Sequence, residues 1–385
     1  MDLSFTVDEQ AFADEAAAWL QANLAEVGRP DHFDSLADEI DWGRRWQVRM
    51  ARDRWVGIAW PTEYGGRSAR PVEVALYNMA YAAVGAPQPV NRVGINLAGP
   101  TLLAHGTDAQ RARWLPSILD ATELWCQLFS EPDAGSDLAA LRTRATPAEG
   151  PDGEPGWTVT GQKIWTSYAQ FARWGMALVR TDPDAPRHRG ISYLVIDMQA
   201  PGVVVRPLRQ LTGDAEFNEV FLTDVFVPAD HLVGELHDGW TVANTTLAHE
   251  RGTSFPFKEQ VVHEVYLDRL YRLAADAGRL DEPELGDALA QSFVEVRLLR
   301  LHNWRTLSRL GRGLEPGPES SWVKLAWTDM TQHLSATALE VVGPDAALAG
   351  PWTRQWLWSK AASIAGGTSE VQRSIIGERV LGLPR

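Results

Sequence analysis

Three short segments of the chain bring hydroxyl groups, backbone N–H groups and an aromatic ring close together in sequence. They are residues 128–137 (LFSEPDAGSD), 161–167 (GQKIWTS) and 366–373 (GGTSEVQR). In the first two segments, serine and threonine hydroxyls accompany a tryptophan, which suits a flat ligand with polar edges and an apolar face. The alternative for these two segments is structural: an ordinary β-turn and residues of a β-core.

The third segment precedes a predicted helix from Glu370 to Arg379. The first N–H groups of a helix have no intrahelical acceptor, and the positive end of the helix dipole lies there. The stretch from Gly366 to Ser369 would therefore suit an anion or a polarised ligand edge. A plain helix cap by the hydroxyl of Thr368 or Ser369 is the alternative.

The elements that position these segments follow the order α, β, α. Thr6 and Glu9 form a predicted capping box at the start of the first helix. Further helices are predicted over residues 42–53, 71–84, 108–119, 261–275, 282–310, 321–342 and 353–379, and short runs of β-branched and aromatic residues between 122 and 236 predict strands. This order argues against a doubly wound α/β sheet, in which strands and helices alternate.

The predicted fold class is α+β with several domains. A chain of 385 residues with 45% hydrophobic residues is long enough for two or three domains. We expect an N-terminal helical domain over residues 1–121, a central β-barrel or β-sandwich domain over residues 122–236, and a C-terminal four-helix bundle over residues 237–385.

Composition and missing motifs exclude several classes of function. The formal net charge of -14 repels phosphate backbones, so no nucleic acid partner is expected. No stretch is long and apolar enough for a membrane span. The chain has no dinucleotide-binding, Walker or Gly-x-Ser-x-Gly motif, and its nine histidines lack metal-ligand spacing, so no metal site is predicted.

Cys126 is the only cysteine. It cannot form an intrachain disulfide, and its neighbours Trp125 and Leu128 predict a small buried hydrophobe rather than a nucleophile. The first residues show no signal-peptide pattern. We therefore expect an unprocessed protein of the reducing cytoplasm.

Together the three segments resemble those of the acyl-CoA dehydrogenase flavoproteins. Residues 60–66, 218–221 and 225–228 also resemble stretches of that family in the same order, so the resemblance covers essentially the whole chain. Each motif alone is weakly specific, whereas their common order is strongly specific. The resemblance implies FAD as cofactor and an oxidoreductase of lipid metabolism that introduces an α,β double bond into an acyl thioester, carried on CoA or on an acyl carrier protein.

The resemblance also implies roles for individual residues. Phe129 and Ser130 would border the flavin ring, Trp165 would pack on it, and Thr166 and Ser167 would hydrogen-bond to its edge. Ser136 matches a position that contacts the pantetheine or CoA arm of the substrate. Further cofactor contacts are implied for Gln127, Gly135, Ser136, Gly343, Gly367, Thr368 and Glu370.

The chain departs from many straight-chain members at Gly366, where they carry the catalytic Glu. Other members place the base on a different helix, and the corresponding residue here is Glu250. Glu250 would remove the α-proton while the β-hydrogen leaves as hydride to flavin N5. The backbone N–H of Gly366 would polarise the thioester oxygen. Arg251 matches an arginine near the CoA or catalytic segment, and an ion pair with the adjacent Glu is its alternative.

A second departure concerns the grip on the FAD pyrophosphate. Many homotetrameric members use an Arg-x-x-Phe-Gly stretch for it, whereas residues 274–281 contain Arg279 but no Phe-Gly, and the usual Gly-Gly is altered in residues 342–345. In both changes the chain resembles a subgroup of the family that acts on bulky thioesters. Some members of that subgroup form heteromeric pairs. We expect a homodimer, a homotetramer or a heterotetramer in which this chain supplies the base, with an electron-transfer flavoprotein as electron acceptor.

Two other functions stay open from the sequence. The first is a flavin oxidase or monooxygenase of the same fold, which differs from a dehydrogenase by fast reaction of its reduced flavin with oxygen. The second is a non-catalytic or base-supplying subunit of a heteromeric enzyme. The sequence does not identify the acyl group, because the depth of the cavity depends on packing.

Overall fold

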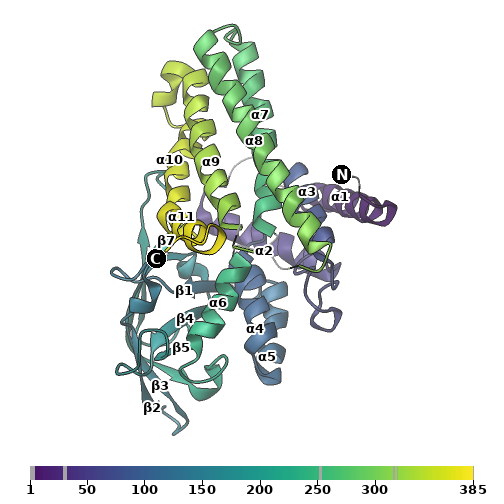
Figure 1. Cartoon of the computed structure of the whole chain (residues 1–385). Coiled ribbons are helices and arrows are strands. Elements are labelled where there is room, and N and C mark those ends of the chain that lie inside the picture. Colours follow the sequence, from purple (N-terminus) through teal and green to yellow (C-terminus); the bar gives the residue numbers. More distant parts are fainter. Residues whose placement is uncertain (1–4, 29–32, 251–253, 315–316, 319, 385) are drawn as a thin grey trace. The chain divides into compact units, whose positions relative to one another are not determined.

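The computed structural model describes residues 5–28, 33–250, 254–314, 317–318 and 320–384. Helices come first, strands follow, and helices return, which confirms the predicted order α, β, α (Figure 1). Contacts divide the chain into two compact units: a β-unit (Val27–Ser68 and Pro87–Glu250) and a helical unit (Met1–Glu26, Ala69–Ala86 and Arg251–Arg385). The three-domain division by chain order stays a prediction, because these units are grouped by packing.

The β-unit is built on one seven-stranded sheet. Its strands are β1 (Trp125–Leu128), β2 (Arg144–Glu149), β3 (Pro155–Ser167), β4 (Trp174–Arg180), β5 (Ile191–Asp197), β6 (Val203–Leu208) and β7 (Phe217–Pro228). The strand order is β1-β4-β2-β3-β7-β6, with β5 paired to β4. Strands β1 and β4 are parallel, whereas the long pair of β3 and β7 is antiparallel and has two register shifts.

Burial along the strands shows which of them are covered on both faces. Nearly every residue of β4 and β5 is buried, whereas burial alternates along most of β7. Alternation is the pattern of a strand with one face toward the core. The core of the sheet includes Val159, Val220 and Val225, all fully buried, together with Cys126. Burial raises the pKa of the Cys126 thiol, so the predicted small buried hydrophobe is confirmed.

Four helices of the β-unit are α2 (Leu36–Arg52), α4 (Gly99–His105), α5 (Asp108–Leu119) and α6 (Gly239–Glu250), and a short π-helix (Gly94–Ala98) leads into α4. Helix α5 has the predicted limits because Thr107 and Gln110 form a capping box. Helix α2 begins six residues before the predicted start, because the Ser35 hydroxyl accepts a hydrogen bond from the Asp38 N–H at 3.2 Å. Helix α6 packs on β5 and α4.

The helical unit contains α1 (Val7–Val27, whose last residue falls in the β-unit), α3 (Pro71–Ala83), α7 (Ser254–Asp276), α8 (Pro283–Leu310), α9 (Ser320–Val342), α10 (Pro351–Ser359) and α11 (Ser369–Ile375). The long helices α7, α8 and α9 run side by side (Figure 1). Their shared core includes Leu270, Leu289 and Leu334. The capping box predicted at Thr6 and Glu9 is present, with hydrogen bonds of 2.9 and 3.3 Å.

The prediction of one helix over residues 353–379 is wrong. Helix α10 ends at Ser359, a 3-10 turn follows, and α11 begins only at Ser369. Between them, Gly366 and Gly367 have φ angles of +66° and +91°, in the left-handed region that a right-handed helix cannot include. Among the helices that the structure describes, none combines the length and apolar character that crossing a membrane requires.

A buried ion pair connects the strands that carry the first two segments. Lys163 of β3 is fully buried, and its Nζ donates to Glu131 Oε1 at 2.8 Å, to the Leu178 carbonyl at 2.8 Å and to the Phe129 carbonyl at 3.2 Å. The Glu131 carboxylate also accepts backbone N–H bonds from Arg142 and Thr143 at 2.6 and 2.9 Å. One cation therefore connects β3, β4, the end of β1 and the approach to β2.

The protonation of both partners follows from this environment. Burial lowers the pKa of Lys163, and the charge of Glu131 opposes that shift. Burial would raise the pKa of Glu131, but the positive charge and hydrogen bonds around it hold that pKa below its ordinary value. Since the carboxylate is stabilised in the folded state, its contribution to stability is present at neutral pH and is lost as the pH falls through its lowered pKa.

Replacing Lys163 by methionine should destabilise the β-unit strongly. Lys163→Met leaves a carboxylate buried without its cation, which costs about 3–5 kcal/mol in the free energy of unfolding. Denaturant unfolding at neutral pH measures this change. The double variant Lys163→Met/Glu131→Gln should recover part of the loss.

The matched control is Arg142→Met, because Arg142 pairs with Asp133 at 3.7 Å with both side chains about four-fifths exposed. Its free energy of unfolding should be nearly unchanged. Equal stability of Lys163→Met and the wild type would show that the buried pair does not connect these strands.

Candidate active site

The structure brings the first two predicted segments together. The Ile164 N–H donates to the Ser130 carbonyl at 3.0 Å, next to the bond from Lys163 to the Phe129 carbonyl. Phe129 is buried and contacts Tyr193 edge to face, with ring centroids 5.9 Å apart. Segments separated by about thirty residues of chain therefore form one edge of the β-unit, as their predicted common role requires.

Trp165 is exposed at this edge in an unusual backbone conformation. Its side chain is 60% exposed, although most tryptophans of the described chain are buried or half-buried. Its φ angle is +61°, which is uncommon for a residue with a side chain. It lies in the register shift between Lys163 and Thr166, and its ring contacts Phe217 edge to face at 6.2 Å. The bulge therefore holds a large flat ring toward solvent instead of in the core.

Thr166, beside this ring, has an unsatisfied hydroxyl. The residue is 1% exposed, and its Oγ1 has no hydrogen-bond partner in the described part of the chain. A buried hydroxyl without a partner is costly, and such groups are typical of positions that bind something else. Ser167, the last residue of β3, and Ser130, two residues after the end of β1, are half-buried. An exposed ring, a buried hydroxyl and two accessible serines fit a flat cofactor with polar edges.

The other predicted contacts of the β-unit lie on β1 and on the turn that follows it. Gln127 is half-buried in β1, opposite Met176 of β4. The backbones of Glu131 and Ala134 exchange two hydrogen bonds of 3.1 Å, which close a tight turn. Gly135 and Ser136 follow that turn and are exposed. Ser136 is thus accessible for the substrate arm that the sequence predicted there.

The predicted base is carried by helix α6, which ends at Glu250. Two polar contacts fix this helix to α4: Thr246 Oγ1 lies 2.8 Å from Thr101 Oγ1, and Thr245 Oγ1 lies 2.8 Å from His105 Nε2. Thr246 is fully buried and is one helical turn before Glu250. The helix that carries the predicted base is therefore fixed to α4 within the β-unit. Arg251 lies outside the described residues.

The third segment lies in the helical unit, and its glycines are required by the backbone. A side chain at Gly366 would have to adopt the left-handed region, at a cost of about 1–2 kcal/mol. The carboxamide of Gln372, fully buried, donates to the carbonyls of Gly366 and Gly367 at 3.2 and 3.3 Å. Glycine therefore suits this backbone conformation better than the glutamate that the straight-chain members carry at the matching position.

The start of α11 satisfies the helix-cap alternative. Thr368 is the N-cap residue, and its hydroxyl accepts from the Val371 N–H at 3.2 Å. Glu370 is exposed on the first turn, and its pKa lies below the ordinary value because its own backbone N–H and then the Thr368 hydroxyl bind the carboxylate. The cofactor contacts of Thr368 and Glu370 stay predictions.

Arg279 is fully engaged within the chain. Its Nε and Nη2 each donate to the Glu282 carboxylate at 2.7 Å, and its Nη1 donates to the carbonyls of Glu340 and Val341 at 2.6 and 3.1 Å. It thereby caps the end of α9, just before Gly343, whose φ angle is +68°. A guanidinium with these four bonds has little capacity left for a pyrophosphate, which strengthens the departure noted in the sequence.

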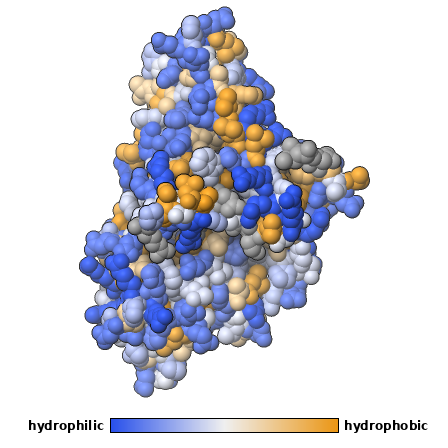
Figure 2. Space-filling model, in the orientation of Figure 1, coloured by the Kyte–Doolittle hydropathy of each residue, from blue (hydrophilic) through white to orange (hydrophobic). Residues whose placement is uncertain are grey.

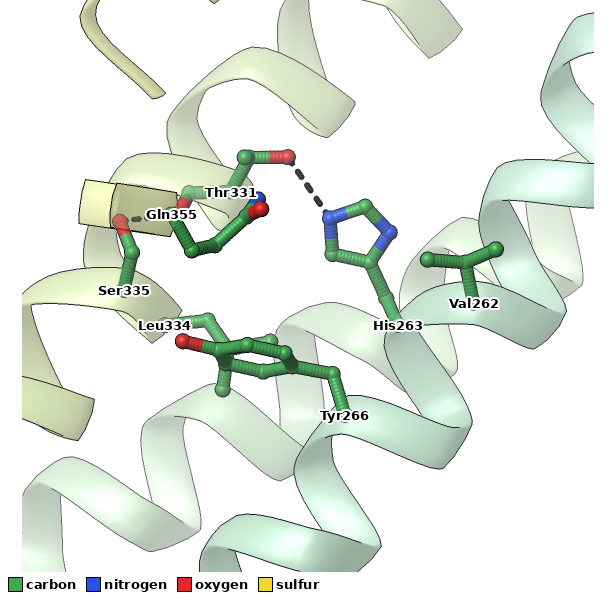
Figure 3. Close-up of a pocket in the computed structure, with 7 residues that line it drawn as sticks. All are labelled: Val262, His263, Tyr266, Thr331, Leu334, Ser335 and Gln355. Carbon is green, nitrogen blue, oxygen red and sulfur yellow. Dashed lines mark hydrogen bonds between the residues drawn. The ribbon is translucent and has the colours of Figure 1, made fainter. Parts of the chain in front are cut away.

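A small pocket elsewhere in the helical unit is too small for a cofactor. It lies between α7, α9 and α10 and has a volume of about 40 Å³ (Figure 3). His263 reaches Thr331 Oγ1 across it at 3.0 Å, and the Tyr266 hydroxyl has no partner in the described chain. Ligand pockets are typically about 300–1,000 Å³. This pocket contains none of the predicted site residues.

The sequence did not reveal three polar residues on which the site depends: Lys163, Asn218 and Gln372. All three are fully buried and hydrogen-bonded to backbone carbonyls of the predicted segments. Each one belongs to a motif that the sequence had already singled out. A polar residue at a buried position was the available signal. The partners of Lys163 and Asn218 are remote in sequence, whereas those of Gln372 lie only five and six residues before it.

Models and relatives of one protein family match the chain over nearly its whole length. The models of the acyl-CoA dehydrogenase N-terminal, middle and C-terminal domains match residues 6–122, 126–225 and 237–381. The chain is 39% identical over 391 aligned positions to acyl-CoA dehydrogenase IpdE1 of Mycobacterium tuberculosis, covering 98% of both proteins. It is 42% identical to acyl-CoA dehydrogenase FadE34 of the same organism, covering 95% of this chain and 50% of that protein.

Two solved structures share the fold over the full chain. The steroid ACAD Tcur3481-Tcur3483 has a TM-score of 0.85 at 27% identity, covering 100% of both chains. The ChsE4-ChsE5 complex from Mycobacterium tuberculosis has a TM-score of 0.84 at 31% identity, also covering 100% of both chains.

Replacing Thr166 by valine should not destabilise the ligand-free protein. Valine has the same shape without the unsatisfied hydroxyl, so Thr166→Val should leave the ligand-free protein as stable as the wild type, or more stable by up to about 1 kcal/mol. Denaturant unfolding of the ligand-free protein measures this. Thr101→Val is the control: its equally buried hydroxyl donates to the Leu97 carbonyl at 2.8 Å, so its loss should destabilise. A Thr166→Val variant as unstable as Thr101→Val would contradict this account.

Proposed function

Because the chain belongs to the acyl-CoA dehydrogenase family and is thus an oxidoreductase acting on CH–CH groups, we propose that it binds FAD and introduces the α,β double bond of an acyl thioester. The observation that carries this proposal is the edge formed by exposed, left-handed Trp165 and the buried, unpartnered hydroxyl of Thr166. Members of the family are flavoproteins, so this edge is assigned to the flavin.

The residues of the β-unit suit each part of that cofactor. The Trp165 ring offers an apolar face, and the Thr166 hydroxyl and the half-buried Ser130 and Ser167 offer polar groups to its edges. Phe129, buried next to Ser130, is the second aromatic residue assigned to the flavin. Bound FAD would supply the acceptor for the hydride that leaves the substrate Cβ. Electrons would then pass to an electron-transfer flavoprotein.

Glu250 is proposed as the base. Its carboxylate would take the proton from the substrate Cα, while the hydrogen on Cβ leaves with its bonding electrons and the double bond forms between the two carbons. The α-proton of a thioester is weakly acidic, so a base and a polarised thioester oxygen are both required. The backbone N–H of Gly366 is proposed as the donor to that oxygen. The contacts of Thr245 and Thr246 support this assignment, because they fix the helix that ends at Glu250.

The proposed substrate is an acyl thioester with a bulky acyl group. A solved structure with 27% identity over the full chain is a steroid ACAD, which favours ring-bearing acyl groups over short straight chains. The proposed location is the cytoplasm, since the single cysteine is buried in the sheet and excludes an intrachain disulfide.

Glu250→Gln should abolish the chemistry and retain the cofactor. Glutamine keeps the shape of the side chain and cannot accept the α-proton, so bleaching of the flavin absorption should slow by about 100-fold or more. Anaerobic mixing with a panel of straight-chain and ring-bearing acyl thioesters, followed by visible absorbance, measures the rate and identifies the substrate class.

The control is Glu235→Gln, which changes an exposed carboxylate shortly before α6 and should bleach as the wild type does. Bleaching of Glu250→Gln at the wild-type rate would exclude Glu250 as the base. A wild-type protein that binds flavin but does not bleach with any thioester would contradict the dehydrogenase function.

A heteromeric assembly is the second part of the proposal. Arg279 is hydrogen-bonded within the chain, and the Phe-Gly that usually helps to bind the pyrophosphate is missing. A partner subunit with its own pyrophosphate-binding residues would therefore complete the site. The ChsE4-ChsE5 structure shows that such complexes exist among similar proteins. Apolar residues exposed along α8 support an interface; they are Phe293, Val294, Leu298 and Leu301. Figure 2 shows hydrophobic patches among hydrophilic residues over the long helices.

Arg279→Ala should therefore act on stability and leave flavin content unchanged. Its loss removes the cap of α9 and the pair with Glu282, so the midpoint of thermal unfolding should fall. The ratio of flavin to protein absorbance in the purified enzyme or complex should equal that of the wild type. A stable variant that loses flavin would show instead that Arg279 grips the pyrophosphate.

A further inference from the structure

The segment that carries Trp165 contains two left-handed residues within four positions. Trp165 has a φ angle of +61° and Tyr168 one of +54°, and neither is glycine. Such conformations cost free energy and persist only where surrounding contacts determine them. The register of β3 against β7 shifts between Lys163 and Thr166, so the strand bulges at this point. Some interaction must therefore hold the strand in this shape.

Asn218 of β7 makes the contacts that do so. It is fully buried, and its Nδ2 donates to the Thr166 carbonyl at 2.9 Å, to Gln170 Oε1 at 2.6 Å and to the Glu216 carbonyl at 3.1 Å. Two of these acceptors are backbone carbonyls, which cannot donate, so the orientation of the carboxamide is determined by its partners. Asn218 is also the residue opposite Thr166 in the ladder.

The remaining contacts of the segment converge on the same short stretch of β7 and the residue before it. The Tyr168 N–H donates to the Glu216 carbonyl at 2.8 Å, and the Tyr168 hydroxyl donates to the Glu216 carboxylate at 3.1 Å. Phe217, next to Asn218, contacts the Trp165 ring. The carboxamide thus ties the C-terminal side of the bulge, at Thr166 and Gln170, to the start of β7 and the residue before it.

We propose that Asn218 is a positioning residue that holds Trp165 in its left-handed, exposed conformation and thereby prepares the flavin-binding edge. This inference rests on the proposed function of that edge. Without the three bonds, β3 can straighten across residues 164–166. Because side chains alternate along a strand, removing the bulge moves the Trp165 ring toward the opposite face. Asn218 need not contact the cofactor to control its binding.

The chain supplies a closely matched control in the helical unit. Asn303 is also fully buried, and its Nδ2 donates to the Pro256 carbonyl at 2.9 Å and to Gln260 Oε1 at 3.0 Å. In both asparagines the Oδ1 atom has no partner in the described chain. Asn303→Ala therefore removes the same kind of interaction at a position outside the flavin-binding edge.

The experiment compares FAD dissociation constants by titrating protein from which flavin has been removed, and thermal unfolding of the same samples. Asn218→Ala should raise the dissociation constant about ten-fold or more, as expected for lost hydrogen bonds that organise the site. Asn303→Ala should lower the unfolding midpoint to a similar extent with an unchanged dissociation constant. An equal rise for both variants would show that Asn218 acts only through general stability and would overturn the proposal.

A double-mutant cycle with Trp165→Ala tests whether Asn218 acts through the tryptophan. The double variant should bind FAD no more weakly than Trp165→Ala alone, because the ring to be positioned is already missing. Two fully additive effects on the dissociation constant would overturn the proposal. The visible spectrum of the bound flavin should shift in the same direction in Asn218→Ala and Trp165→Ala, and be unchanged in Asn303→Ala.

A crystal structure of ligand-free Asn218→Ala separates this inference from the proposed function. If Trp165 leaves the left-handed region, the positioning role is supported whether or not the chain binds FAD. If Trp165 keeps its conformation, the positioning role is wrong even where FAD binding is confirmed. A wild-type protein that binds no FAD, alone or in a complex, contradicts the proposed function and leaves the crystallographic result to decide the role of Asn218.

Discussion

The buried pair of Lys163 and Glu131 is the interaction on which the candidate site depends. A lysine has three protons to donate, and here two acceptors, the Phe129 carbonyl and the Glu131 carboxylate, lie on the segment after β1 and the third, the Leu178 carbonyl, lies on β4. Buried ion pairs are often no more stabilising than apolar residues of the same volume, because both charges lose their hydration. What this pair provides is a unique arrangement: only one register of β3 places the ammonium group among its three acceptors.

The sequence predicted those parts of the fold that local chemistry determines. Helix α5 has its predicted limits because its capping residues are adjacent in sequence, and α3 begins at Pro71, as expected for a proline in a first helical turn. The start of α2 was missed because Ser35 caps a turn that precedes the apolar pattern. The hydrophobic spacing over residues 353–379 missed the break at Gly366 and Gly367, because spacing does not report φ angles, whereas the helix predicted from Glu370 begins one residue earlier, at Ser369.

In the candidate site, too, the sequence did not predict the features that depend on contacts between remote parts of the chain. The motifs pointed to Ser130, Trp165 and Thr166, and the structure brings all three to one edge. The conformation of Trp165 was not predictable, because the carboxamide tied to its neighbour Thr166 comes from Asn218, 52 residues further along the chain. The assignment of Glu250 follows the resemblance to a family, and the backbone at Gly366 gives a physical reason why a carboxylate would be strained there.

The burial of Cys126 has a practical consequence for studying this protein. A thiol in the middle of the sheet, with its pKa raised by burial, presents neither the exposure nor the thiolate that maleimides and iodoacetamides require. These reagents should therefore not label the native chain as long as it stays folded. A cysteine introduced at any exposed position would carry a spectroscopic label at one defined site without removal of the native residue, and slow labelling of Cys126 itself would report the opening of the sheet.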